Sequence, residues 1–193
     1  LIWWERRCPH PLLPLDMFRN RGLAMLFTLA LLVGVTMYSL LFYAPLLLQG
    51  GFGLSPQQAG LLITPMVVFI TVGSIVNGRI ITRIRNPNRM LYAGFLLMAF
   101  SCLGIVTTHS YTSHLLIGAY MTMAGLGMGF IMPNLTVFAQ QTAGRSHLGI
   151  ATALLQSLRM IGGMLGTAIV GTMVSHSYFN VVGSTLRGAP AQW

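Results

Sequence analysis

One arginine lies inside a long apolar run and is the residue of this chain best placed to act in a mechanism. If a helix begins near Leu148, Arg159 lies about 16 Å along it, deep in a membrane. A charge near the centre of a spanning helix costs roughly 2.5–3.5 kcal/mol on insertion scales, so the presence of Arg159 there calls for a functional or structural explanation. Two interpretations stay open. Arg159 takes part in coupling or conformational change, paired with an acid outside this chain, or it snorkels to the interface or binds backbone carbonyls.

Polar side chains form a stripe on the first long apolar run. On a helical wheel its two threonines, its serine and a tyrosine fall within an arc of about 80°, and on the last run a glutamine lies close to the arginine. Such faces could contact an amphipathic molecule through hydroxyls and an aromatic ring. The alternative is hydrogen bonding between helices, worth about 0.6 kcal/mol on average. The substrate-cavity candidates are Thr28, Thr36, Ser39, Tyr43 and Gln156.

Glycines recur at a spacing that brings helices together rather than binding a ligand. Gly125 with Gly129, and Gly162 with Gly166, are small residues four apart, which lets two helix backbones approach closely in lipid. A proline inside such a helix permits a bend. The residues assigned to helix packing are Gly125, Gly129, Pro133, Gly162, Gly163 and Gly166.

The chain has no motif for enzyme chemistry. It contains no phosphate loop, nucleophile motif or pair of carboxylates, and its only acids are Glu5 and Asp16. Cys8 and Cys102 are too few for a disulfide framework, and no histidine pair has the spacing of metal ligands. We therefore predict no catalytic residue, metal or cofactor.

The composition places this chain in a lipid bilayer. Of its 193 residues, 54% are hydrophobic and 7% are charged, with a mean hydropathy of +0.73, whereas a soluble domain carries roughly 25% charged residues. A net charge of +9 would suggest nucleic acid in a soluble protein. Here the arginines cluster between apolar runs, so membrane topology explains the charge better and no nucleic acid is expected.

Five apolar runs are long enough to cross a membrane, which takes about 20 residues of helix. Because the backbone in lipid must satisfy its own hydrogen bonds, these runs predict helices and an all-α membrane protein. Ser55 followed by Pro56 is typical of a helix start. The predicted spans are approximately 23–48, 59–78, 90–108, 115–140 and 148–174.

The arginines in the connections predict the orientation. Nine of the eleven precede the first span or lie in the second and fourth connections, and the tail carries only Arg187. By the positive-inside rule the arginine-rich side is cytoplasmic. The expected organisation is a cytoplasmic segment at 1–22, a five-helix unit at 23–174, and an extracytoplasmic loop or tail at 175–193.

Several motifs occur in an order that is typical of one family. Gly53-Leu54-Ser55-Pro56 leads into Ala59-Gly60-Leu61, and Arg159 is followed by Gly162-Gly163 and Gly166. In this order and spacing, residues 1–175 resemble the fourteen-helix drug:proton antiporters of the EmrB/QacA type, in the major facilitator superfamily. The superfamily's cytoplasmic loop motif is matched by Gly78 and Arg83, but Thr82 stands where that motif has its acid.

The resemblance implies proton-coupled export of lipophilic or cationic drugs through a partial major-facilitator bundle. The five spans look like helices nine to thirteen of fourteen, which leaves the first eight and the last outside this chain. The proton-carrying acids of the family lie largely in its first half, and none of the five spans contains Asp, Glu or Lys. The implied coupling or conformational residues are Arg159, Gly78 and Arg83.

The same resemblance implies the setting and the partners. It predicts a multi-pass protein of the cell membrane, the inner membrane in a Gram-negative bacterium. The expected partners are the lipid bilayer, a small-molecule substrate, protons as the coupling ion, the missing half of the transporter and a periplasmic adaptor.

Two other functions remain open on the sequence alone. One is a major-facilitator transporter of another small organic solute, in which Arg159 would bind an anionic substrate directly. The other is a scaffold subunit of a membrane assembly that transports nothing, which would suit the absence of acids from the spans.

Overall fold

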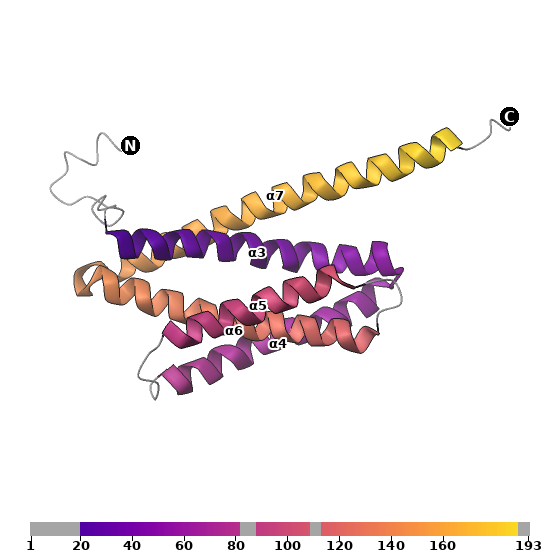
Figure 1. Ribbon diagram of the computed structural model, residues 1–193. Coiled ribbons are helices and arrows are strands. Elements are labelled where there is room, and N and C mark those ends of the chain that lie inside the picture. Colours follow the sequence, from indigo (N-terminus) through magenta and orange to yellow (C-terminus); the bar gives the residue numbers. More distant parts are fainter. Residues whose placement is uncertain (1–19, 82–87, 109–112, 189–193) are drawn as a thin grey trace, which may run out of the picture.

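A computed structural model describes residues 20–81, 88–108 and 113–188 of the chain, and these form helices joined by short connections. Apart from one short 3-10 turn at Arg145–His147, the described residues contain five helices and no strand. The five are α3 (Arg21–Phe52), α4 (Pro56–Ile81), α5 (Asn88–Val106), α6 (His114–Ala143) and α7 (Leu148–Gly188) (Figure 1).

The five predicted spans are confirmed as helices long and apolar enough to cross a membrane. The last span, predicted to end near residue 174, agrees with a candidate span that ends at His176. Helix α7 continues beyond this span to Gly188, into the part predicted as a loop or tail. The serines and the single glycine between 175 and 187 lower helix propensity without breaking the helix, and no proline interrupts it.

Local signals explain where the helices begin and end. At the start of α4, Ser55 and Gln58 form a reciprocal capping box: the Gln58 N–H donates to Ser55 Oγ over 3.3 Å, and the Ser55 N–H donates to Gln58 Oε1 over 3.1 Å. The Asn20 side chain accepts a hydrogen bond from the Gly22 N–H at the start of α3. Gly53 ends α3 with a φ of 66°, a left-handed conformation that costs glycine little. The helix start predicted at Ser55-Pro56 is therefore present.

The helices run alternately up and down, which gathers the charges at one end of the bundle. Arg21 begins α3, Arg79 and Arg89 flank the connection between α4 and α5, and Arg145 lies between α6 and α7. The start of α3, the end of α4, the start of α5 and the turn from α6 to α7 all lie at the left of Figure 1. The fold thus separates an arginine-rich end from the end that carries the other connections.

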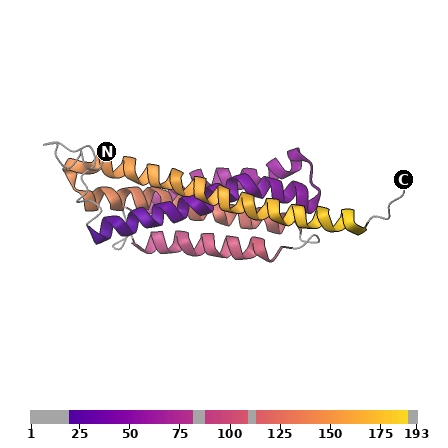
Figure 2. The ribbon, with the colours of Figure 1, turned by 90° about the horizontal axis from the view of Figure 1, so that it is seen from above.

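Helices α3 and α7 pack backbone against backbone at glycines. A side chain at Gly162 would collide with the Leu31 carbonyl, and one at Gly34 would collide with the Arg159 carbonyl. The two helices cross in contact with one another (Figures 1 and 2). Because lipid is as apolar as a leucine side chain, such close packing replaces the hydrophobic effect as the force between helices.

Helix α6 is held by α4 and α5 in the same way. Gly125 lies against the Met66 backbone of α4, and Gly129 lies against Ile70 and Gly73. On another side, Gly127 lies against Gly94 of α5. The structure therefore contains two tightly packed groups, α3 with α7 and α4 with α5 and α6.

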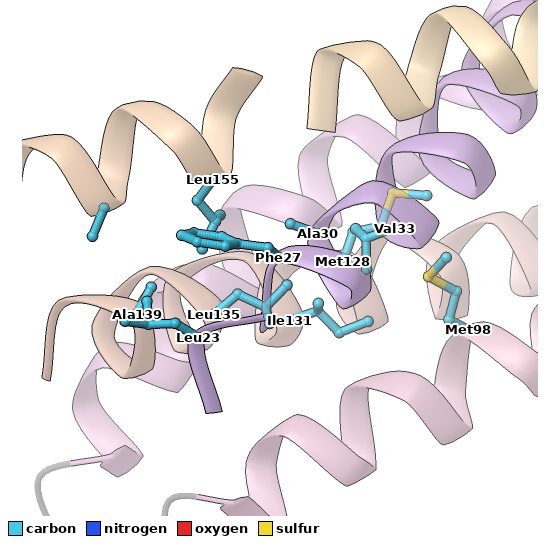
Figure 3. Packing of buried hydrophobic residues seen from close by; sticks show 11 residues of the cluster. Leu23, Phe27, Ala30, Val33, Met98, Met128, Ile131, Leu135, Ala139 and Leu155 are labelled. Atoms are coloured by element: carbon cyan, nitrogen blue, oxygen red, sulfur yellow. The ribbon is translucent and has the colours of Figure 1, made fainter. Parts of the chain in front are cut away.

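An apolar core joins the two groups at the arginine-rich half of the bundle. Phe27 of α3 lies between Leu155 of α7 and Leu135 of α6 in the close view (Figure 3). The buried members of this cluster are Leu23, Phe27, Ala30, Val33, Met98, Met128, Ile131, Leu135, Ala139, Ala151 and Leu155.

A buried pair of asparagines also joins α4 to α6. Asn134 Nδ2 donates to Asn77 Oδ1 over 2.9 Å and to the Phe130 carbonyl over 2.7 Å. Asn77 is 1% exposed and Asn134 is 0% exposed, so neither amide reaches lipid or water. Burying amides is costly unless they bond to each other, so this pair favours one register between the two helices.

Replacing Asn77 alone should weaken the bundle more than replacing both asparagines. In Asn77→Leu the Asn134 amide loses its partner, and we expect a loss of about 0.6–1.7 kcal/mol in stability. The double variant Asn77→Leu/Asn134→Leu removes both polar groups and should recover part of that loss. Unfolding by sodium dodecyl sulfate would measure the stability of the purified single and double variants. If the losses of the two single variants simply add in the double variant, the prediction is contradicted.

Candidate functional site

An apolar cavity of about 440 Å³ lies where α3, α5 and α6 meet, towards the end of the bundle away from the arginine cluster. Its volume is within the range of roughly 300–1,000 Å³ that is typical of pockets for drug-sized ligands. Three of the sequence-predicted cavity residues line it, namely Thr36, Ser39 and Tyr43. Cys102 and Ile105 of α5 and Met121 of α6 form much of the opposite wall.

The hydroxyls on the α3 wall of the cavity mostly form hydrogen bonds within the protein. Thr36 Oγ1 donates to the Leu32 carbonyl over 3.0 Å, and the Tyr43 hydroxyl donates to the Thr167 carbonyl of α7 over 2.9 Å. Ser39 Oγ is buried against Gly166 and has no hydrogen-bond partner among the described residues. The cavity therefore selects by shape and apolar contact more than by hydrogen bonds.

A second cavity of about 310 Å³ continues along the seam between α3 and α5. It shares Thr36 and Cys102 with the first cavity, and its other walls include Phe95 and Met98. No charged side chain lines either cavity. Together they form an uncharged path along one face of α3.

Two of the predicted cavity residues lie outside these cavities. Thr28 is exposed on α3, and its hydroxyl donates to the Ala24 carbonyl over 2.9 Å. Gln156 is exposed on α7. The wheel places Thr28 on the same stripe as Thr36, but the helices that close the cavity do not cover α3 at that level.

Arg159 is buried at the junction of α3, α6 and α7. Its side chain is 8% exposed, and Nη1 contacts the Met132 Sδ of α6 at 3.3 Å. Its Nε is buried without a hydrogen-bond partner among the described residues. The guanidinium therefore does not snorkel to the interface in this structure, because it points into α6 at the level of Pro133.

The structure places the other candidates as follows. Gly78 is exposed in the last turn of α4, with open space around its Cα, and Arg83 lies outside the described residues. Gly163 and Gly166 lie against Tyr38 and Val35 of α3. In the parts of the chain that the structure describes, no three His, Cys, Asp or Glu side chains lie together as a metal site would need.

The asparagine pair and the α5 wall of the cavity were not among the predicted site residues. Asn77 and Asn134 stand out in the sequence as amides inside apolar runs, which is a signal that could have singled them out. Cys102 and Ile105 carry no such signal, since their role depends on which helices meet.

Removing the Tyr43 hydroxyl should cost stability without changing the shape of the cavity. Tyr43→Phe loses one interhelical hydrogen bond between α3 and α7, and we expect a decrease of about 0.6 kcal/mol. The exposed Tyr92 of α5 supplies the matched control, Tyr92→Phe, which should unfold like the parent protein. Thermal unfolding of the purified protein would compare the two, and equal midpoints would contradict the prediction.

Comparison with known proteins gives the family. Residues 6–167 match the Major Facilitator Superfamily. The chain is 30% identical to the multidrug transporter protein MdtP of Bacillus subtilis, over 89% of this chain and 31% of that protein. It is 32% identical to a tetracenomycin C resistance and export protein of Streptomyces glaucescens, over 89% of this chain and 32% of that protein. It is 31% identical to a methylenomycin A resistance protein of Streptomyces coelicolor, over 90% of this chain and 36% of that protein. The chain thus spans about a third of the length of these relatives.

Proposed function

Because this chain belongs to the major facilitator superfamily, a family of membrane transporters rather than enzymes, we propose that the protein carrying it exports lipophilic or cationic drugs in exchange for protons. The observation that carries the proposal is the uncharged cavity beside α3, whose walls suit a lipophilic molecule of drug size. The names of the relatives refer to multidrug transport, export and resistance, and they also support drug export as the function.

The proposed architecture is that of the fourteen-helix EmrB/QacA type. In it the described helices α3 to α7 correspond to helices nine to thirteen, and residues 1–22 lie in the cytoplasm before the five-helix unit. The arginines at one end of the bundle support this orientation by the positive-inside rule. The protein would lie in the cell membrane, or in the inner membrane of a Gram-negative bacterium.

Proton coupling in this proposal depends on acids outside the described spans. The spans of the described chain contain no Asp, Glu or Lys, so protons would be carried by the other half of the transporter. Arg159, together with the loop residues Gly78 and Arg83, would transmit the change of conformation. A periplasmic adaptor is a further proposed partner.

Filling the cavity should reduce efflux. We would express the full-length gene in a host that lacks its own exporters and follow efflux of ethidium, with and without an uncoupler. Thr36→Phe places a ring in the space that the drug would occupy and should lower the efflux rate about fivefold or more, which corresponds to roughly 1 kcal/mol in the barrier. Thr64→Phe is the matched control, because Thr64 is exposed and its hydroxyl also bonds the carbonyl four residues earlier.

The results would separate the parts of the proposal. Uncoupler-sensitive efflux that Thr36→Phe reduces and Thr64→Phe preserves, at equal protein level, supports both proton-coupled export and the cavity. Equal efflux from both variants removes the cavity from the pathway. If the unaltered protein moves no ethidium, the favoured function becomes transport of another small organic solute.

A further inference from the structure

A second groove, of about 180 Å³, lies on another face of α3, where α7 packs against it. Tyr38 and Phe42 of α3 form one wall, with ring centroids 6.3 Å apart and planes inclined by 17°. Met160 and Met164 of α7 form the other wall. None of these four residues lines the apolar cavities described above.

The aromatic wall of the groove is held in place by its packing against α7. The Tyr38 ring lies directly on Gly163, where any larger residue would displace it. Phe42 stacks on Tyr38 and is 57% exposed, so its outer surface is available to a ligand. Stacked rings facing two thioethers offer polarizable contacts that suit another aromatic ring.

The surface around the groove is not built for lipid alone. On α7 a stripe within an arc of about 100° holds Gln156, Met160, Gly163, Met164 and Thr167. Gln156 lies one turn from Met160 and is exposed. The Gln156 amide lies beside the exposed Met160 and Met164, and an amide favours a polar neighbour or water over lipid tails on this face.

The charge near the groove restricts what it can bind. Arg159 is buried one turn before Gly163, and no acid among the described residues neutralises it. Its positive potential disfavours a cation in the groove. Apart from the Tyr38 phenol, the lining offers an anion no hydrogen-bond donor, because the Thr167 hydroxyl donates to the Gly163 carbonyl over 2.9 Å. An uncharged ring fits this mostly apolar and aromatic lining best.

We propose that this groove binds an uncharged, planar aromatic portion of the transported molecule. The inference rests on the proposed export function and adds a chemical preference to it. An engineered cavity of about 150 Å³ in another protein binds benzene, so 180 Å³ admits a small ring system. It is below the size that takes a whole drug, and the rest of the molecule lies outside the groove.

Two dyes with the same three-ring skeleton would test the preference, namely neutral acridone and cationic proflavine. Their binding to the purified full-length protein would be measured by fluorescence polarisation, for the unaltered protein, Phe42→Leu and Phe100→Leu. Phe100 of α5 is as exposed as Phe42 but lies far from the groove, so it is the matched control. We expect Phe42→Leu to weaken acridone binding roughly 3- to 10-fold and to leave proflavine binding unchanged. Met164→Leu, which keeps the volume and removes the sulfur, should weaken acridone binding about twofold.

Ethidium efflux by the unaltered protein, measured in parallel, separates this inference from the proposed function. If efflux is present and acridone binds equally to Phe42→Leu and Phe100→Leu, the groove is not the site and export stands. A parallel loss of acridone and proflavine binding in Phe42→Leu overturns the preference for uncharged rings. Absence of both efflux and dye binding in the unaltered protein overturns the export function and the inference together.

Discussion

Arg159→Ala should abolish uncoupler-sensitive efflux while the protein still reaches the membrane in normal amount. We expect at least a tenfold lower rate, which corresponds to about 1.4 kcal/mol or more in the barrier. The reason is the position of the guanidinium, which is buried between three helices and bonded only to a thioether at Met132 among the described residues. A cation kept in such a place needs an opposite charge in some conformation, and that exchange is what the alanine removes.

Stability would distinguish a working role for Arg159 from a structural one. Arg159→Met fills the same space without the charge, so the purified protein should unfold at the same or a higher temperature, because a buried charge without an acid opposes folding. Efflux should nevertheless be lost. Arg145→Ala, at the exposed connection between α6 and α7, should behave like the unaltered protein in both assays. Efflux that survives Arg159→Met at full rate would return Arg159 to a passive role.

Gly162→Ala should destabilise the protein by about 1–3 kcal/mol, although alanine favours a helix more than glycine does. The added methyl group would meet the Leu31 backbone carbonyl, and a backbone atom cannot move aside as a flexible side chain can. The variant must therefore push α3 and α7 apart along the face where their other glycine contacts lie. Unfolding in detergent, followed by the loss of helical circular dichroism, would measure the cost.

The matched control for this prediction is Gly118→Ala. Gly118 also lies inside a helix, α6, but a methyl group there meets nothing within 4 Å. Alanine should therefore leave the stability unchanged or raise it by up to about 1 kcal/mol. Equal effects at the two positions would show that helix propensity, not the contact with Leu31, governs Gly162.

The features that the sequence predicted correctly depend on local physics. Five apolar runs longer than a bilayer core must be helices, because lipid offers no other partner for the backbone. The start of α4 followed from Ser55 and Pro56, whose preferences hold in any fold. Arg159 was singled out because a charge inside a span is costly in every context.

The features that the sequence did not predict depend on which helices meet. The wheel grouped Thr28 with Thr36, but only Thr36 lies beside α5, so only Thr36 reaches the cavity. Hydropathy located the end of the last span near residue 174 but not the end of α7, because a helix can continue beyond the lipid. Tyr38 and Met160 become neighbours only through the packing of α3 on α7.

Pro133 stands between two residues of α6 that make polar contacts with other helices. Arg159 Nη1 of α7 donates to Met132 Sδ, and Asn134 Nδ2 donates to Asn77 Oδ1 of α4. Proline cannot donate to the carbonyl of Gly129, so α6 bends most easily at this point. Because the two contacts flank the same proline, a bend of α6 at this point would move both of them, and the packing of α4 and the position of Arg159 would change together.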